Sequence, residues 1–71
     1  MDTQWQQAIA AALAKLDDKF RVPLILHYFD DMSMLEIGQI LQIPAGTVKS
    51  RLHKGRALLK AALGKEGISY A

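Results

Sequence analysis

The side chains best suited to chemistry in this chain gather in one stretch, Lys49–Arg56. Lysine can reach guanine acceptors or phosphate oxygens, and serine and histidine can hydrogen-bond the edges of bases. If Val48, Leu52 and Leu59 face the protein interior, a helical period of 3.6 turns a set of mostly polar residues outward. These are Thr47, Lys49, Ser50, His53, Lys54 and Ala57. Gly46, just before them, lets another backbone approach closely.

The charge of the chain is distributed unevenly. Residues 1–48 carry three cations and six anions, whereas residues 49–71 carry six cations and one anion, within a net charge of +2. Such asymmetry points to a polyanionic partner for the C-terminal part. On charge alone, a solvated helix face explains the pattern equally well.

Length and composition limit the other possibilities. Seventy-one residues make one small domain or a fragment, and the absence of cysteine excludes disulfides and thiolate metal sites. The longest apolar run, Val22–Leu26, is far shorter than the ~20 residues that cross a bilayer. We therefore expect no membrane partner and a cytoplasmic location.

Catalytic and metal-binding patterns are missing from the sequence. The two histidines, His27 and His53, have no second ligand or nucleophile at a diagnostic spacing. The acidic pairs Asp17–Asp18 and Asp30–Asp31 fit helix caps and turns better than acid–base pairs. We expect no enzyme activity, no cofactor, no metal and no small-molecule substrate.

Two amphipathic helices are predicted in the first part of the chain. Apolar residues recur at helical spacing over 3–16, capped by Asp2 or Thr3. Asp17 and Asp18 can cap a second helix that runs to about Phe29 and buries one face, made of Phe20, Leu24, Ile25 and Tyr28 or their neighbours. Pro23 lies past the first turn of that helix, so we expect a kink or a tightened start.

The clearest local signal is a capping box, in which Ser33 and Glu36 satisfy each other's backbone N–H groups. Met32 and Ile37 stand at the positions of a hydrophobic staple. This third helix must end by about Ile43, because a proline disfavours helical geometry in the residue before it.

The last helix is predicted to open at residues 44–47 and to stop at Gly64, followed by a flexible tail over 65–71. A short capped helix, a turn and a longer basic helix make a helix-turn-helix over about 33–63, in which the second helix enters the major groove. The fold class is therefore all-α, a small four-helix domain of residues 1–64. Two helices joined by a proline turn also occur in small bundles that bind no DNA.

Four segments resemble region 4 of bacterial sigma-70-type sigma factors, closest to the extracytoplasmic-function (ECF) group. They are Leu16–Phe29, Met32–Ile37, Ile43–Leu52 and Gly55–Leu59. The resemblance covers about Leu16 to Leu63, and Glu36-Ile37 together with the run 46–52 makes it quite specific.

The resemblance implies a transcription-initiation module that reads the promoter minus-35 element and docks on the beta flap of RNA polymerase core. Many members are also held inactive by an anti-sigma factor. Carried over by position, the base-reading residues are Lys49, Ser50, His53 and Lys54. Gly46, Thr47, Arg51 and Arg56 are implied to contact phosphates or to hold the structure, with an Arg51–Glu36 ion pair as the alternative for Arg51.

Some positions depart from the family pattern. Asp31 stands where glycine is usual, and aspartate tolerates the left-handed geometry needed there. Gly38 replaces an alanine, which keeps a close helix contact but weakens the helix by up to ~1 kcal/mol. His53 occupies a variable position and so bears on which promoter is read.

The region that melts the minus-10 element is not in this chain. We therefore expect the chain to be an isolated domain or a region-4-only protein.

Two other functions stay open. A protein-interaction module that docks on the beta flap or an anti-sigma factor, with weak DNA binding, is the alternative. A response-regulator-type helix-turn-helix fits less well, because it usually has histidine where this chain has Arg51.

Overall fold

The computed structural model describes residues 3–65, and these form four helices without a strand. The helices are α1 (Thr3–Ala14), α2 (Asp18–Tyr28), α3 (Met34–Leu41) and α4 (Ala45–Lys65). The all-α, four-helix prediction is confirmed. The flexible tail is predicted over 65–71, but Lys65 is the last residue of α4, and residues 66–71 lie outside the described residues.

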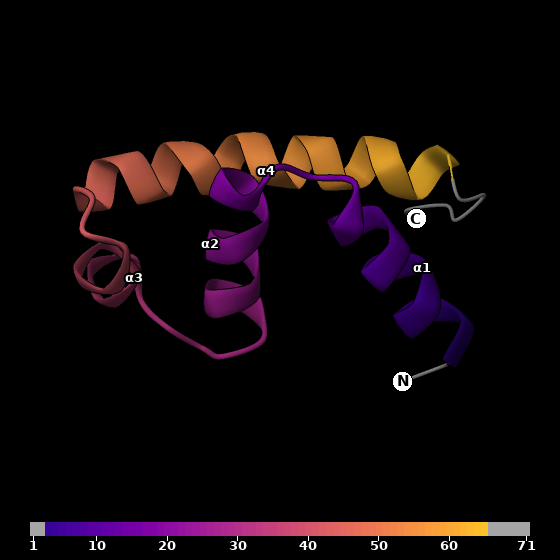
Figure 1. Ribbon diagram of the computed structural model, residues 1–71, viewed down its shortest axis with the longest axis horizontal. Coiled ribbons are helices and arrows are strands. Elements are labelled where there is room, and N and C mark those ends of the chain that lie inside the picture. Colours follow the sequence, from indigo (N-terminus) through magenta and orange to yellow (C-terminus); the bar gives the residue numbers. More distant parts are fainter. Residues whose placement is uncertain (1–2, 66–71) are drawn as a thin grey trace.

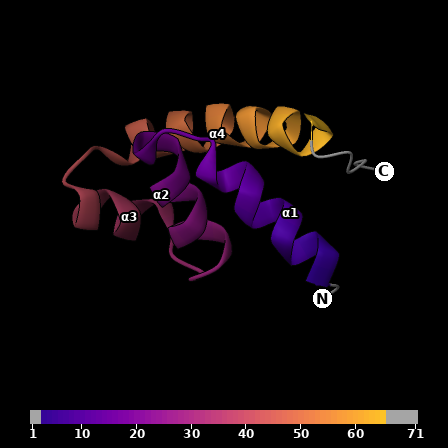
Figure 2. The ribbon, with the colours of Figure 1, turned by 45° about the vertical axis from the view of Figure 1, so that its right-hand side comes forward.

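The long helix α4 is the element on which the other three pack. Figure 1 shows α4 lengthwise, with α3 and α2 beneath its N-terminal half and α1 beneath its C-terminal half, and the turned view in Figure 2 agrees. The molecule measures 35 × 21 × 21 Å. Because α3 and α2 share one half of α4, the helix-turn-helix is supported from behind by α2.

Two apolar clusters attach the helices to α4. The larger one joins α2, α3 and the N-terminal half of α4 with the end of α1, through Leu13, Leu16, Leu24, Ile37, Val48 and Leu52. The smaller one joins α1 to the C-terminal half of α4, through Ala8, Ala12, Ala62 and Leu63. The apolar stripe predicted for α4 is thus confirmed as its buried face.

The first two helices differ from the prediction at their ends. α1 stops at Ala14 rather than at Leu16, although Leu16 still lies in the core. Asp17 is the N-cap of α2 and Asp18 lies in its first turn, as predicted, although the Asp17 side chain makes no capping hydrogen bond. Its carbonyl accepts the N–H groups of Phe20 and Arg21 at 3.0 and 2.9 Å instead, and the Asp18 carboxylate pairs with the Arg21 guanidinium.

The buried face of α2 is narrower than predicted. Leu24 is buried and Phe20 and Ile25 are half-buried, but Tyr28 is 49% exposed. α2 continues past Pro23, which is buried, and a kink there stays a prediction. The exposed Tyr28 is therefore available for contacts outside the core.

The start of α3 is confirmed in detail. The Glu36 N–H donates to Ser33 Oγ at 3.1 Å, and the Ser33 N–H donates to Glu36 Oε1 at 3.0 Å. Met32 packs against the cluster that contains Ile37, as a hydrophobic staple requires. Just before the cap, Asp31 has a φ of 55°, the left-handed geometry predicted for it.

The turn between α3 and α4 is closed around Gly38. Gln42 caps α3 in the left-handed region with a φ of 59°, and the N–H groups of Gln42 and Ile43 both donate to the Gly38 carbonyl. A Cβ at Gly38 would lie 2.7 Å from the Ile43 carbonyl oxygen. Glycine is therefore what lets the chain fold back so tightly.

Backbone hydrogen bonds start α4 at Pro44, and a close contact at Gly55 holds α4 against α2. The Pro44 carbonyl accepts the N–H groups of Thr47 and Val48 at 3.0 and 3.1 Å. At Gly55 an added Cβ would lie 3.1 Å from Leu24 Cδ1, so α2 crosses α4 at close range there. Gly64 lies inside the helix, so the prediction that it ends α4 is wrong.

We predict that Gly38→Ala lowers the free energy of unfolding by about 1–2 kcal/mol, because a backbone oxygen must move to admit the methyl group. Urea unfolding followed by circular dichroism measures this change. Gly64→Ala is the matched control, since a Cβ there meets nothing within 4 Å. Gly64→Ala should raise the free energy of unfolding by up to about 1 kcal/mol, because alanine has the higher helix propensity. An equal increase for Gly38→Ala would contradict the tight turn.

A pH dependence follows from the capping box. Hydrogen bonds from the Ser33 backbone and then its side chain hold the pKa of Glu36 below its ordinary value of 4.5. Because the folded state lowers this pKa, the carboxylate stabilises the fold above the unfolded pKa, and the contribution disappears as the pH falls through the folded pKa. Unfolding of wild type and Glu36→Gln should therefore differ at neutral pH and converge in acid, whereas a constant difference would exclude this origin.

Candidate nucleic-acid interface

The predicted base-reading residues lie together on the exposed face of α4. Lys49, Ser50, His53 and Lys54 are all exposed in the N-terminal half of this helix. The opposite face of the same turns holds Val48 and Leu52, which are buried against α2 and α3. Core packing therefore turns Lys49, Ser50, His53 and Lys54 toward solvent, as the helical period predicts. We call these four residues the polar row.

The first turn of α4 is open to a ligand. A Cβ at Gly46 would meet nothing within 4 Å, so packing inside this chain does not require glycine there. The Ser50 hydroxyl donates to the Gly46 carbonyl at 3.1 Å. Because its only proton is used in this bond, Ser50 is left to act as an acceptor toward a base.

One flank of the polar row is hollowed. Lys49, Ser50, His53 and Arg56 surround a depression of about 350 Å³, whose apolar walls come from Met34 and Leu52. The depression lies where α3 meets α4. The structure therefore brings three of the four base-reading candidates together with one phosphate-contacting candidate.

Lys54 lies on the other flank. Its ammonium is 5.9 Å from the centre of the Phe20 ring, and the ammonium of Lys19 is 5.1 Å from the same ring. A cation over an aromatic face is attracted by the ring quadrupole. The two lysines therefore have different surroundings: Lys54 lies near the Phe20 ring, and Lys49 borders the depression beside α3.

The remaining phosphate-contacting candidates are less exposed. Thr47 and Arg51 are half-buried. Among the residues that the structure describes, no ion pair joins Arg51 to Glu36, so the alternative role suggested for Arg51 is wrong. The Glu36 carboxylate already accepts the Ser33 N–H in the capping box.

Arg56 makes a long-range contact that the sequence analysis missed. Its Nη1 donates to the Tyr28 hydroxyl at 2.5 Å, joining α4 to the end of α2. The helical spacing of Tyr28 predicts a place in the core, whereas its side chain is 49% exposed. No local pattern links residues so far apart in sequence, so only the packing of α2 on α4 reveals the pair.

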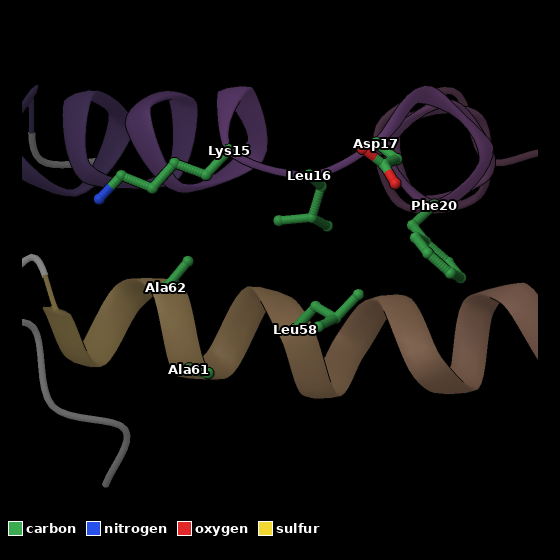
Figure 3. Close-up of a pocket in the computed structure, with 7 residues that line it drawn as sticks. All are labelled: Lys15, Leu16, Asp17, Phe20, Leu58, Ala61 and Ala62. Carbon is green, nitrogen blue, oxygen red and sulfur yellow. The ribbon is translucent and has the colours of Figure 1, made fainter.

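Other regions of the described chain offer less chemistry. A hollow of about 310 Å³ lies between the α1–α2 connection and α4. Figure 3 shows Phe20 pointing toward α4 and the side chain of Lys15 pointing away from Leu58. Within residues 3–65 no three acidic or histidine side chains group to hold a metal ion. None of the described helices is both long and apolar enough to cross a membrane.

Comparison with known proteins decides the family. Residues 6–59 match the family described as Sigma-70, region 4. The chain belongs to this family. Sigma factors are transcription proteins rather than enzymes, and the matched residues include all of α3 and the part of α4 up to residue 59.

Relatives with this region include ECF sigma factors. The chain is 49% identical over 55 residues to the ECF RNA polymerase sigma factor SigW of Bacillus subtilis, which covers 78% of the chain and 29% of SigW. It is 38% identical over 70 residues to the ECF RNA polymerase sigma factor SigE of Mycolicibacterium smegmatis, covering 99% of the chain and 27% of SigE. The chain thus spans less than a third of the length of these two relatives.

Proposed function

We propose that this domain binds the minus-35 element of a promoter as region 4 of an RNA polymerase sigma factor and so directs transcription initiation. The observation that carries the proposal is the exposed polar row on the N-terminal half of α4, which packs against α3 and α2. The family membership and the similarity to ECF sigma factors support it. A cytoplasmic location follows from this role, because promoter DNA lies there.

Charge supports the same function. Lys49, Arg51, Lys54 and Arg56 lie in consecutive turns of α4, and no acidic residue lies in this helix. Neutralising phosphates with such cations releases counterions and supplies sequence-independent affinity. The basic helix can therefore hold the domain on DNA while neighbouring side chains read the bases.

The side chains divide into two groups by role. Lys49, Ser50, His53 and Lys54 are the base-reading candidates, with Ser50 accepting a hydrogen bond from the amino group of cytosine or adenine. The phosphate-contacting candidates are Gly46, Thr47, Arg51 and Arg56. The N–H groups of Thr47 and Val48 already donate to the Pro44 carbonyl, so the N–H groups of Ala45 and Gly46 are the ones that a phosphate can approach over the open surface at Gly46.

We predict that Lys49→Ala weakens binding to a minus-35-like duplex about tenfold and reduces the preference over a scrambled duplex. A contact to a base edge is worth about 1–3 kcal/mol, which supports this magnitude. Lys54→Ala should also reduce this preference, because Lys54 is a base-reading candidate as well. Fluorescence anisotropy over a salt series measures both effects.

Lys15→Ala is the matched control for these variants. It removes the same charge but lies beside the C-terminal half of α4, far along the helix from the polar row (Figure 3). We expect its affinity and sequence preference to equal those of wild type. Binding that ignores sequence and is the same in all three variants would reject promoter recognition by this helix.

An apolar groove favours a second function, docking on a protein. Ile9, Ala10 and Leu13 of α1 line a groove of about 380 Å³ with Gln6 and Phe29, and Phe29 is 57% exposed. Exposed aromatic side chains beside an apolar groove are typical of protein interfaces. We infer that this groove binds the beta flap of RNA polymerase core or an anti-sigma factor.

We predict that Phe29→Ser weakens binding to RNA polymerase core at least about fivefold, because a central aromatic residue commonly contributes more than 1 kcal/mol to an interface. Surface plasmon resonance with immobilised core enzyme measures the change. Leu58→Ser is the control, since Leu58 is also exposed but lies on the other hollow. Equal loss in both variants, or loss of DNA binding in Phe29→Ser, would contradict a separate docking groove.

A further inference from the structure

The contact between Arg56 and Tyr28 is formed outside the core. Arg56 Nη1 donates to the Tyr28 hydroxyl at 2.5 Å across two helices. Arg56 is exposed and Tyr28 is 49% exposed, so neither side chain is held there by burial. The hydrogen bond itself therefore decides where the guanidinium lies.

Tyr28 is in turn fixed by its neighbour. The His27 ring packs edge-on against the Tyr28 ring, with centroids 4.8 Å apart and planes at 80°. His27 Nδ1 lies 2.8 Å from the Met32 carbonyl oxygen, in the connection that leads into α3. The tyrosine is thus tied to the start of the helix-turn-helix as well as to α2.

The partner of Arg56 is neutral, and this matters for an anion. A carboxylate would orient the guanidinium but also compensate its charge, whereas a phenol hydroxyl orients it and leaves the positive charge available. The guanidinium keeps its other N–H donors, and Arg56 lines the same depression as Lys49 and His53. An arginine held in this way loses less conformational freedom when a phosphate binds.

We propose that Tyr28 is a positioning residue that holds Arg56 ready for a DNA phosphate next to the base-reading row. This inference rests on the proposed promoter recognition and adds a residue of α2 to it. A phosphate contact carries no sequence information. Loss of the tyrosine hydroxyl therefore lowers the affinity for a minus-35-like duplex and a scrambled duplex by the same factor.

A double-mutant cycle tests the proposal with the whole chain. Anisotropy is measured for wild type, Tyr28→Phe, Arg56→Ala and the double variant on both duplexes. We expect Tyr28→Phe to weaken binding about two- to tenfold when Arg56 is present and to have no effect when Arg56 is alanine. Lys15→Ala, which lies beside the C-terminal half of α4, is the control and should bind as wild type does.

A measurement without DNA separates this inference from the proposed function. NMR relaxation of the Arg56 Nε–Hε group should show greater mobility in Tyr28→Phe than in wild type, while thermal unfolding shows that both are folded. Equal mobility, or equal loss of affinity with and without Arg56, would overturn the role of Tyr28 even if promoter binding stands. Absence of sequence-dependent binding by wild type would overturn promoter recognition, whatever the NMR shows about Tyr28.

Discussion

Burial of one apolar stripe of α4 is the constraint on which the rest of the domain depends. Val48, Leu52 and Leu63 on this stripe are almost completely buried, and three separate helices supply the surface that covers them. None of those three helices is long enough to be stable alone in water. The long helix therefore organises the shorter ones, and they fix its rotation about its own axis.

That fixed rotation is what creates the interface. Once the apolar stripe is buried, the helical period leaves the basic and hydrogen-bonding residues facing outward. α3 must also stay close to the beginning of α4, and the glycine at position 38 allows this because any larger residue would meet the Ile43 carbonyl. A small domain without cysteine thus presents its polar row through packing and a tight turn.

The cations of α4 are not equivalent, although they look alike in sequence. Lys54 lies over the Phe20 ring, Arg56 is bound to the Tyr28 hydroxyl, and Lys49 borders the depression beside α3. In two of these cases an aromatic residue of α2 is the partner. α2 therefore supports the helix-turn-helix from behind and also orients side chains at both edges of its recognition helix.

The residue pattern predicts the helices, the capping box and the face of α4 that carries the polar row. These features depend on local hydrogen bonds and on a period of 3.6 residues, both of which can be read over a few turns. Helix ends are less predictable, because α1 ends at Ala14 although its apolar pattern continues to Leu16, which packs in the core outside the helix. The exposure of Tyr28, the lack of an Arg51–Glu36 ion pair and the neighbours that orient Lys54 and Arg56 follow instead from how the helices pack. Those contacts join residues distant in the chain, so they exist only after α2 and α3 have packed on α4.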